Sequence, residues 1–526
     1  RLRHGLPLYT APSPDWMPFI YPPGYSAVVA ALGVVAGDVS PGLARSVSIA
    51  GSLAAALAVV YAGGRLGRSW AGGVLGACFF LLTYADSGAF MDLVRPDGLA
   101  TGLLAWALVL GLERDRRATV ASGLLLAASF TVKQHAAAFG IPMALGIWAD
   151  RGWREGLRFG IASAGPALAY VALMELVSGG WFLVWVVDVA GAHPLVMERW
   201  YPGTMGEVGR DLPWLVLFTT VAMVAGTAKL QRSQAARVAV VAAAVLVGWL
   251  SLGVGQEIVA VYELFGTTPQ FRTAPRLDFG ARTFWVAQGA GVGAGLAGLA
   301  GFALQRRVPG RWAYGMGVAL VAFVLGGVMR AHHGGYLNVY IPIHLVLAIA
   351  VAVAIGKLRA WRPGLLVAVL TLVPVLVQLR AEDADRFDPA TYVPDAADVE
   401  AGMEFVEALR ACDAPVLAPI DPWMAVMAGH TPAWHLMGLW DIDHPRGPIA
   451  EYAADVDVVV HEQRWSCVVM GDAPMRHGFR ESYTEAWRPA TGGGRSLRPR
   501  TGWPARPSSI WKPIPRGPSE PGPSGG

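Results

Sequence analysis

The sequence predicts a mainly α-helical, polytopic membrane bundle followed by a small C-terminal α/β domain. Of the 526 residues, 54% are hydrophobic and only 15% are charged, with a mean hydropathy of +0.43. Soluble domains carry charge on about a quarter of their residues. Apolar runs long enough to cross a hydrocarbon core of about 30 Å recur along the chain. This composition excludes a soluble globular enzyme and a disordered chain, and three cysteines are too few for a disulfide scaffold.

The apolar runs divide the first part of the chain into an outer segment and a helical bundle. In residues 1–41, the diproline Pro22-Pro23 favours an extended backbone, and the apolar run that follows is too short to span. We therefore expect an outer loop and an interfacial helix there, and a transmembrane bundle over 42–379. Twelve spans are expected, near 42–64, 70–86, 97–112, 118–132, 134–149, 158–178, 212–228, 236–254, 283–304, 312–329, 338–356 and 363–379.

Lysine and arginine in the short loops set the expected orientation, because cytoplasmic loops carry an excess of these residues. Alternate connections are basic, through Arg65, Arg68, Arg114, Arg116, Arg117, Arg151, Arg154, Arg158, Lys229, Arg232, Arg237, Arg306, Arg307, Arg311, Lys357, Arg359 and Arg362. We place these connections in the cytoplasm. The segments expected to face outward are 1–41, 87–96, 179–211, 255–282, 330–337 and the region after Leu379.

The region 380–489 differs in composition, since acidic residues return and the apolar runs become short. Three β-like runs and one helical stretch predict a small extracytoplasmic α/β domain. The β-like runs are Pro415–Ile420, Val456–His461 and Ser466–Met470, and the helical stretch is Asp398–Ala411. Residues 490–526 are rich in Pro, Gly, Ser and Arg, and we expect them to lack a core of their own. Cys412 and Cys467 could pair in an oxidising compartment, but their spacing leaves the pairing open.

Most ionisable side chains near the spans gather at the outward ends, whereas a transporter would be expected to place them near the midplane. Two short helices of about fifteen residues, each about 22 Å long, flank Lys133-Gln134-His135, so this break should lie below the outer surface. A cation at that depth requires an anion. We interpret Lys133, Gln134 and His135 as ligands of a lipid-linked phosphate. The alternative is a lysine that reaches the interface or pairs with a neighbouring carboxylate.

Arg95-Pro96-Asp97 opens another span from the outside. Pro96 and Asp97 suit the first turn of a helix. A helix start does not explain Arg95, which could bind a phosphate together with the positive helix end. Asp97 and Asp92 are the visible carboxylates that could act as general base toward an acceptor hydroxyl. Tyr21 could donate to the phosphate or to the bound sugar, or it could belong to a packing loop.

The segment 330–338 supplies candidate substrate contacts at His333, Tyr336 and Asn338. Its adjacent histidines lack the spacing of zinc motifs, so we predict no metal ligand. No Walker loop, nucleophile elbow or strand-linked GxGxxG is present, and nucleotide-driven transport and serine hydrolysis therefore lack support. We predict no cofactor, with a divalent metal as an open alternative, and no nucleic-acid partner.

Taken in order, these elements resemble the GT-C polytopic glycosyltransferases. The elements are Gly5-x-Pro7-Leu8-Tyr9, Ile20-Tyr21-Pro22-Pro23, Arg95-Pro96-Asp97, Thr131-Val132-Lys133-Gln134-His135 and Gly335-Tyr336-x-Asn338. The sequence is most similar to the family 39-like group, which includes protein O-mannosyltransferases, bacterial aminoarabinose transferases and rhizobial core transferases. The resemblance covers about residues 1–380.

The resemblance implies an enzyme that moves a sugar, with inversion, from a polyprenyl-phosphate carrier to a lipid, glycan or protein acceptor. The reaction would take place outside a bacterial plasma membrane and serve the cell envelope. Many members of the family have thirteen spans, and their catalytic carboxylate usually precedes the Gly-x-Pro-Leu-Tyr element. The chain begins four residues before Gly5, without a methionine, so we expect one further span and the main general base upstream of Arg1. The competing hypothesis is a polytopic transporter or lipid-binding membrane protein without catalysis.

Overall fold

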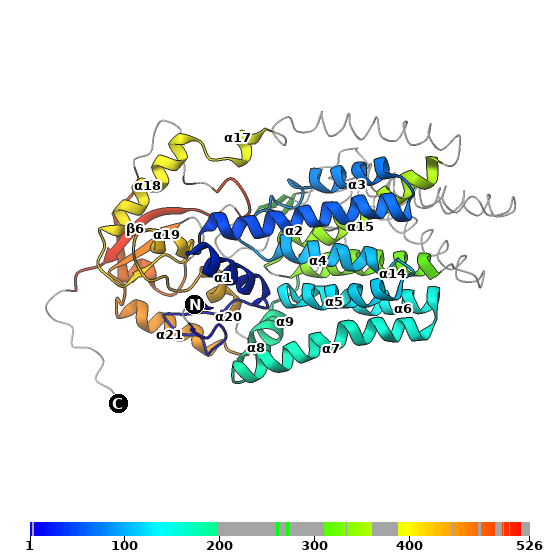
Figure 1. The fold of residues 1–526 in the computed structure, drawn as a ribbon. Helices are drawn as coiled ribbons and strands as arrows, with labels where there is room; N and C mark the ends of the chain where they lie inside the picture. The colour runs from blue at the N-terminus through cyan, green and yellow to red at the C-terminus, as the bar shows by residue number, and fades with distance from the viewer. Residues whose placement is uncertain are drawn as a thin grey trace.

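Figure 1 shows the fold of the protein in a computed structural model. The expected helical class is confirmed for the described residues, which also contain a four-stranded sheet and the two-stranded pair of β1 (Val259–Val261) and β2 (Gln270–Arg272). The expected spans 212–228, 236–254, 283–304 and 363–379 lie outside the described part. The structure describes residues 1–2, 5–196, 199, 204, 259–261, 270–272, 310–332, 334–359, 388–443, 447–471, 475–489, 497, 499–503 and 505–516.

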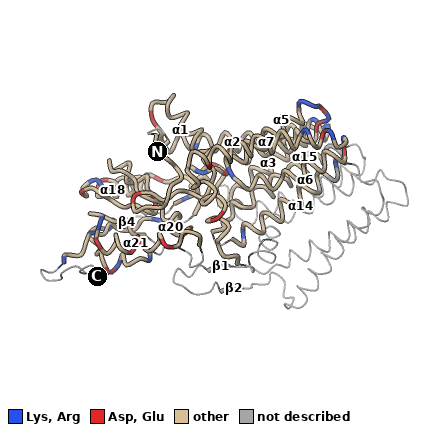
Figure 2. The backbone as a smooth tube through the Cα atoms, turned by 90° about the horizontal axis from the view of Figure 1, so that it is seen from below, with Lys and Arg blue, Asp and Glu red and all other residues tan. Residues whose placement is uncertain are grey.

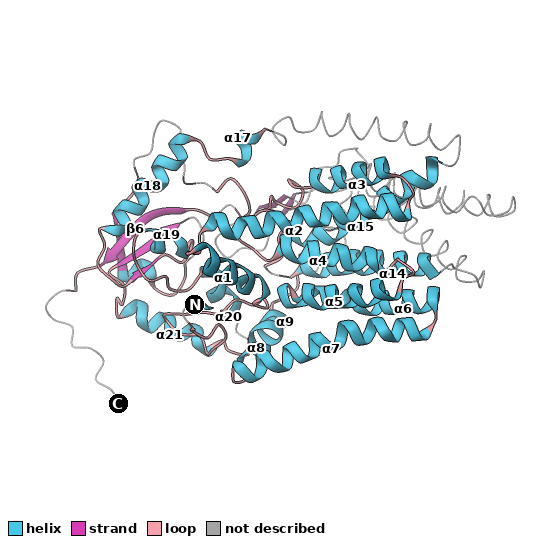
Figure 3. Cartoon of the chain, in the orientation of Figure 1, coloured by secondary structure: helices cyan, strands magenta, loops and turns pink. Residues whose placement is uncertain are grey.

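The bundle consists of helices that run side by side along one direction (Figures 1 and 3). They are α2 (Pro41–Tyr61), its π-helical continuation η2 (Ala62–Leu66), α3 (Trp70–Leu82), α4 (Asp97–Leu110), α5 (Arg116–Val132), the 3-10 turn η3 (Gln134–Phe139), α6 (Gly140–Arg151), α7 (Trp153–Val177), α14 (Gly310–Ala331), the 3-10 turn η6 (Leu337–Tyr340) and α15 (Ile341–Arg359). Eight of the twelve expected spans therefore correspond to described helical segments.

Polar side chains cap the first turns of several of these helices. The Ser40, Ser69 and Asp115 side chains accept hydrogen bonds from backbone N–H groups in the first turns of α2, α3 and α5. Such caps satisfy donors that have no partner within the helix. Packing then joins helices that are distant in sequence, because α2 contacts α4, α6 contacts α14, and α3 contacts α15.

The outer surface of the bundle is apolar. Two described helical segments are long and apolar enough to cross a membrane, Pro41–Leu66 and Trp153–Val177. Along the second segment the side chains of six large apolar residues are exposed: Leu157, Ile161, Leu168, Leu173, Leu176 and Val177. Soluble monomers rarely expose a contiguous apolar surface of this kind, which is typical of contact with lipid. The exposed face of α7 thus agrees with the hydropathy of the whole chain.

The outer segment forms a loop and a short helix, α1 (Gly24–Ala36), as expected for 1–41. A Cβ atom at Gly24 would lie 2.5 Å from the Thr131 carbonyl oxygen, so the absence of a side chain allows α1 to start against the end of α5. At the other end Gly37 adopts φ 86°, a left-handed conformation that terminates the helix.

The C-terminal region contains a four-stranded sheet in the order β3-β4-β6-β5. The strands β3 (Val416–Leu417) and β4 (Cys467–Gly471) are parallel, and β6 (Pro507–Pro513) pairs antiparallel with both β4 and β5 (Tyr483–Trp487). Helices accompany the sheet: α17 (Pro389–Tyr392), α18 (Ala396–Arg410), α19 (Pro422–Met427), α20 (Leu436–Ile442), α21 (Glu451–His461) and α22 (Phe479–Ser482).

Two expectations for this region are wrong. Val456–His461 is not a strand but the second half of α21, in which Val456 and Val460 are buried one helical turn apart. The tail that was expected to lack a core contributes β6, whose Ile510 is buried between β4 and β5. The boundary at 490 therefore cuts the sheet. Cys412 and Cys467 form a disulfide that joins the end of α18 to β4.

The N-terminal loop packs between the bundle and the C-terminal region, near the N label in Figure 1. The Trp185 indole N–H donates to the Thr10 carbonyl oxygen over 2.9 Å. The Tyr9 ring meets Phe182 edge to face at 5.2 Å. Trp185 and Phe182 belong to the helical turns α8 (Trp181–Leu183), η4 (Val184–Val189) and α9 (Ala190–Ala192) that follow α7. This packing holds the loop that carries Tyr21 at the end of the bundle.

Candidate phosphate-binding site

Asp97 lies at the centre of a polar group formed by three elements. At the start of α4, its Oδ1 atom is 2.7 Å from Lys133 Nζ and accepts a hydrogen bond from Asn338 Nδ2 at 2.9 Å. Its Oδ2 atom is 3.4 Å from Arg95 Nε. The Asp97 and Lys133 side chains are only 2% and 4% exposed. The structure therefore brings together Asp97, Lys133 and Asn338, which belong to three separate motifs of the sequence.

Local backbone geometry explains how Lys133 reaches this position. Lys133 ends α5 in an extended conformation, with φ −150° and ψ 119°, and η3 starts directly after it. The predicted break at Lys133-Gln134-His135 is thus confirmed. The break turns the lysine side chain toward α4, where it pairs with Asp97. Of the two interpretations of Lys133, pairing with a neighbouring carboxylate is the one that its contacts match.

Arg95 is the more accessible cation of the group, with 34% of its side chain exposed. One guanidinium NH2 donates to the Tyr21 hydroxyl over 3.2 Å. The guanidinium carbon also lies 5.1 Å from the centre of the Phe90 ring and 5.7 Å from the centre of the Tyr21 ring. Cation–π attraction to these rings orients the guanidinium. Two cations share one carboxylate here, so the group of Arg95, Lys133 and Asp97 carries a positive excess.

Gln134 and His135 lie beside this group and each has a buried polar atom without a partner among the described residues. The Gln134 Nε2 atom donates to the Ile20 carbonyl oxygen over 2.8 Å, whereas its Oε1 atom accepts no hydrogen bond. The same holds for His135 Nδ1. Buried polar atoms are usually hydrogen-bonded, and an exception indicates an unseen water or ligand. The two residues therefore fit the predicted role in donor binding, which remains a prediction.

The structure separates Asp92 from the other predicted site residues. Its carboxylate pairs with Arg45 of α2 and accepts a hydrogen bond from the Tyr84 hydroxyl over 2.8 Å. The Asp97 carboxylate also accepts hydrogen bonds, in its case from Lys133, Asn338 and Arg95. A carboxylate bound in this way is a poor proton acceptor. Both aspartates thus have the geometry of counter-ions, and the role of general base that the sequence suggested for Asp97 and Asp92 stays a prediction.

The segment after α14 reaches the same site. Asn338 contacts Asp97 directly, and the Tyr336 ring lies 5.4 Å from the Phe90 ring that covers Arg95. His333 lies outside the described residues. No group of three or more metal-ligating side chains is present in the part of the chain that the structure describes. The described part of the site consists of the cations Arg95 and Lys133 around Asp97, the side-chain amides of Asn338 and Gln134, and aromatic rings.

Sequence reasoning missed the C-terminal contribution to this area. The His435 ring, at the N-cap of α20, lies 6.2 Å from the Phe19 ring of the N-terminal loop, and the Asp441 Oδ1 atom of α20 lies 3.4 Å from His193 Nε2. No motif in the sequence relates residue 95 to residue 441. These contacts join α20 to the N-terminal loop and to the segment after η4, and that packing is tertiary.

No family model and no curated protein matches the chain. Among solved structures, ArnT from Cupriavidus metallidurans bound to undecaprenyl phosphate is 13% identical, with 85% of this chain and 70% of that chain covered and a TM-score of 0.37. ArnT from the same organism in the apo state is 12% identical, with 88% and 78% covered and a TM-score of 0.38. With identities of 12% and 13% and TM-scores below 0.5, these matches carry no argument about this protein, and the function of the site is argued from its own residues.

Proposed function

We propose that this protein is an integral-membrane glycosyltransferase that uses a polyprenyl-phosphate-linked sugar. The observation that carries the proposal is the arrangement of Arg95, Lys133 and Asp97 at the outward end of the bundle. One carboxylate neutralises one of the two cations. The remaining positive charge is on the more exposed arginine, beside the N-terminus of α4, where an anion is favoured.

The chemistry of the proposed donor matches this charge. When the sugar leaves the carrier, negative charge develops on the departing phosphate. A fixed guanidinium in a partly dehydrated site stabilises such charge better than water does, because the donor groups are already oriented. Arg95 is oriented by Tyr21, Phe90 and Asp97. In this scheme Arg95 binds the phosphate, and Lys133 keeps Asp97 ionised and in place.

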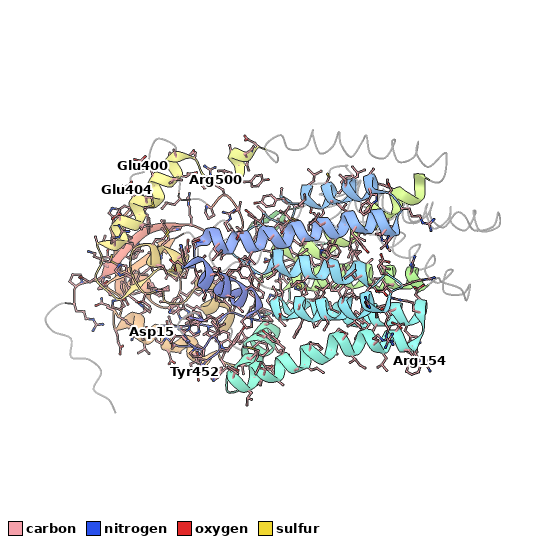
Figure 4. The ribbon with its side chains drawn as sticks, viewed as in Figure 1. Asp15, Arg154, Glu400, Glu404, Tyr452 and Arg500 are labelled. Atoms are coloured by element: carbon pink, nitrogen blue, oxygen red, sulfur yellow. A yellow bond between two sulfur atoms is a disulfide. The ribbon has the colours of Figure 1, made fainter. Side chains whose placement is uncertain are left out.

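The proposed site lies on the extracytoplasmic side of the membrane. Figure 2 shows Lys and Arg gathered at the end of the bundle away from the C-terminal region, and Figure 4 places Arg154 at that end and Asp15 at the opposite one. Basic residues favour the cytoplasmic side. The disulfide between Cys412 and Cys467 favours an oxidising compartment for the other end. Both observations support the predicted orientation.

The competing proposal is a lipid-binding or transporting membrane protein without catalysis. A positive site that binds a lipid phosphate fits that class as well. The two proposals differ in one measurable respect, since only the enzyme transfers a sugar.

The first experiment measures binding of undecaprenyl phosphate to the purified full-length protein in lipid nanodiscs. Arg95→Gln should weaken binding at least tenfold, because a charge-assisted hydrogen bond contributes about 1.5–3 kcal/mol. Arg45→Gln is the matched control, since Arg45 is also an arginine near an outward helix end but is paired with Asp92. Equal binding by wild type and Arg95→Gln would contradict the proposed site.

A second measurement separates the enzyme from the lipid-binding protein. Wild-type protein is incubated with polyprenyl-phosphate sugars and membrane extracts, and the label from the sugar is followed into lipid, glycan and protein fractions. Transfer that is lost in Arg95→Gln and kept in Arg45→Gln supports the enzyme. Tight lipid binding without transfer from any donor supports the competing proposal.

A further inference from the structure

Arg95 belongs to the outer loop, defined here as residues 83–96 between α3 and α4. The same loop contains Phe90, whose ring centre lies 5.1 Å from the Arg95 guanidinium carbon. The Arg95 backbone N–H donates to the Leu93 carbonyl oxygen over 2.7 Å. The position of the guanidinium therefore depends on the backbone conformation of the loop.

Gly88 and Ala89 give the outer loop a backbone that requires support from outside. Gly88 has φ 69° and Ala89 has φ 56°. A residue with a side chain rarely adopts this left-handed conformation, because its Cβ approaches the following carbonyl oxygen. Such a backbone persists where surrounding contacts fix it. The peptide between these two residues is the place where a second part of the chain contacts the loop.

That contact is made by Gly502, in the C-terminal region. The Gly502 N–H donates to the Gly88 carbonyl oxygen over 3.1 Å. A Cβ atom at Gly502 would lie 2.6 Å from Leu93 Cδ1 and 3.7 Å from Phe90 Cε2. Gly502 itself has φ 78°, which favours glycine. The absence of a side chain thus allows the segment to lie directly on the outer loop, beside residues that position Arg95.

Side chains on both sides of Gly502 attach this segment to the C-terminal region, and we call residues 500–503 the clamp. The Arg500 Nε atom donates over 2.9 Å to Asp398 Oδ2 of α18, and Figure 4 labels Arg500 beside that helix. The Asp398 side chain is only 5% exposed. The Trp503 ring meets the Trp440 ring of α20 edge to face at 5.5 Å. The clamp is therefore fixed to α18 and α20 while its glycine contacts the bundle.

A second contact joins the C-terminal region to the same loop. The Tyr392 ring of α17 lies 5.2 Å from the Tyr84 ring, edge to face. The Tyr84 hydroxyl donates to Asp92 over 2.8 Å, within the outer loop. The C-terminal region thus contacts the outer loop near its start, at Tyr84, and again at Gly88 and Leu93.

We propose that the clamp positions Arg95, so that the C-terminal region keeps the guanidinium in the orientation that binds the carrier phosphate. This inference rests on the proposed function, because the ligand is the lipid phosphate of that site. Gly502 touches no reacting group and is a positioning residue that acts through the outer loop. A C-terminal region docked on the bundle is then a condition for binding the sugar donor.

The experiment compares Gly502→Val with the matched control Gly429→Val in the full-length protein in lipid nanodiscs. Gly429 also lies in the C-terminal region and has φ 88°, but no atom lies within 4 Å of its added Cβ. Both variants strain a left-handed backbone, and only Gly502→Val collides with the outer loop. Undecaprenyl phosphate binding should weaken about five- to tenfold in Gly502→Val, because a charge-assisted hydrogen bond depends on the orientation of its donor. Gly429→Val should bind within about twofold of wild type, since distant sites act independently.

A double-mutant cycle tests whether the clamp acts through Arg95. If it does, Gly502→Val added to Arg95→Gln should weaken binding by no more than about twofold beyond Arg95→Gln alone. A general loss of structure affects the lipid site by other routes as well, and the two losses then multiply. Multiplied losses overturn the inference.

Hydrogen exchange without lipid tests the contact itself. Exchange at residues 88–95 should be faster in Gly502→Val than in wild type, while β6 exchanges at the wild-type rate because the sheet stays folded. If β6 also exchanges faster, Trp503→Ala replaces Gly502→Val in all three measurements, and Trp503→Phe, which keeps a ring against Trp440, should restore wild-type behaviour.

The outcomes separate this inference from the proposed function. A wild type that binds undecaprenyl phosphate, together with clamp variants that bind it equally well or leave exchange at residues 88–95 unchanged, overturns only the inference. Equal weakening by Gly429→Val and Gly502→Val also overturns it. A wild type that does not bind undecaprenyl phosphate overturns the proposed function, and the inference with it.

Discussion

At the scale of single residues, the ion pair of Lys133 and Asp97 determines how the site is built. Both side chains are almost fully buried, at 4% and 2% exposure. Removing one member of a buried pair leaves an uncompensated charge, which costs about 3–5 kcal/mol, whereas removing both is far less costly. We therefore expect Lys133→Met to destabilise the protein strongly and the double variant Lys133→Met/Asp97→Asn to recover most of the loss, as measured by thermal unfolding in nanodiscs.

Arg488→Gln is the control for that prediction. Arg488 forms an ion pair with Glu485 on the surface of the C-terminal region. Exposed pairs contribute little to stability, so this variant should unfold like wild type. The interpretation of Lys133 as a counter-ion fails if Lys133→Met is as stable as Arg488→Gln, or if the double variant is less stable than either single one.

The sequence predicted part of this site because charged residues near a membrane are rare and therefore conspicuous. Lys133 and Arg95 were identified in this way, whereas Tyr21 and Asn338 were predicted from the segments 1–41 and 330–338, and the structure brings the four residues together. Their partners could not be predicted, since pairing depends on how α4, α5 and η6 pack. Gly502 could not be identified at all. A single glycine in a segment rich in glycine, proline and arginine carries no signal until tertiary packing places it against the bundle.

At the scale of elements, close contact between α2 and α4 fixes the height of Asp97 in the bundle. A Cβ atom at Gly98 would lie 2.3 Å from the Ser48 carbonyl oxygen, and one at Gly51 would lie 2.5 Å from the Gly98 carbonyl carbon. Glycine thus allows the two backbones to touch, as is common where membrane helices cross. Gly98→Val should separate the helices and displace Asp97, so that both thermal stability and undecaprenyl phosphate binding decrease.

Gly160→Ala is the matched control, because no atom lies within 4 Å of the Cβ that it would add on α7. Alanine is favoured over glycine within a helix by about 1 kcal/mol, so this variant should be at least as stable as wild type. Normal binding by Gly98→Val would show that the helix contact does not position the site.

Helices were easier to predict than strands for a physical reason. A span requires about 20 apolar residues, and runs of that length are rare outside membrane helices. The strands of the C-terminal region are only two to seven residues long. Val456–His461 contains the valines expected of a strand but forms a helix, because Val456 and Val460 pack on the same face of α21. Pro507–Pro513 lies in a segment rich in proline and arginine, and its pairing with β4 and β5 is visible only in the folded sheet.

At the scale of the whole molecule, the disulfide and the basic end of the bundle indicate which way the protein faces. Cys412 and Cys467 are separated by 55 positions. Closing a loop of that length removes conformational entropy from the unfolded chain equivalent to about 4 kcal/mol. Cys412→Ser/Cys467→Ser should therefore lower the stability of the C-terminal region. The expected measurement is faster proteolysis there, with little change in the rate of cleavage of the bundle.

Reporter fusions test the orientation itself, on which the proposed chemistry depends. Alkaline phosphatase folds only in an oxidising compartment, so its fusion after Gly526 should be active. Green fluorescent protein that is exported unfolded does not fluoresce, so its fusion at the same position should be dark. The connection between α4 and α5, which contains Arg114 and leads into Arg116 at the start of α5, is expected in the cytoplasm and should give the opposite pair of results. A reversed pattern would place Arg95 and the C-terminal region on the cytoplasmic side. A reducing compartment there would not maintain the disulfide, and the proposed use of an extracytoplasmic sugar carrier would then be wrong.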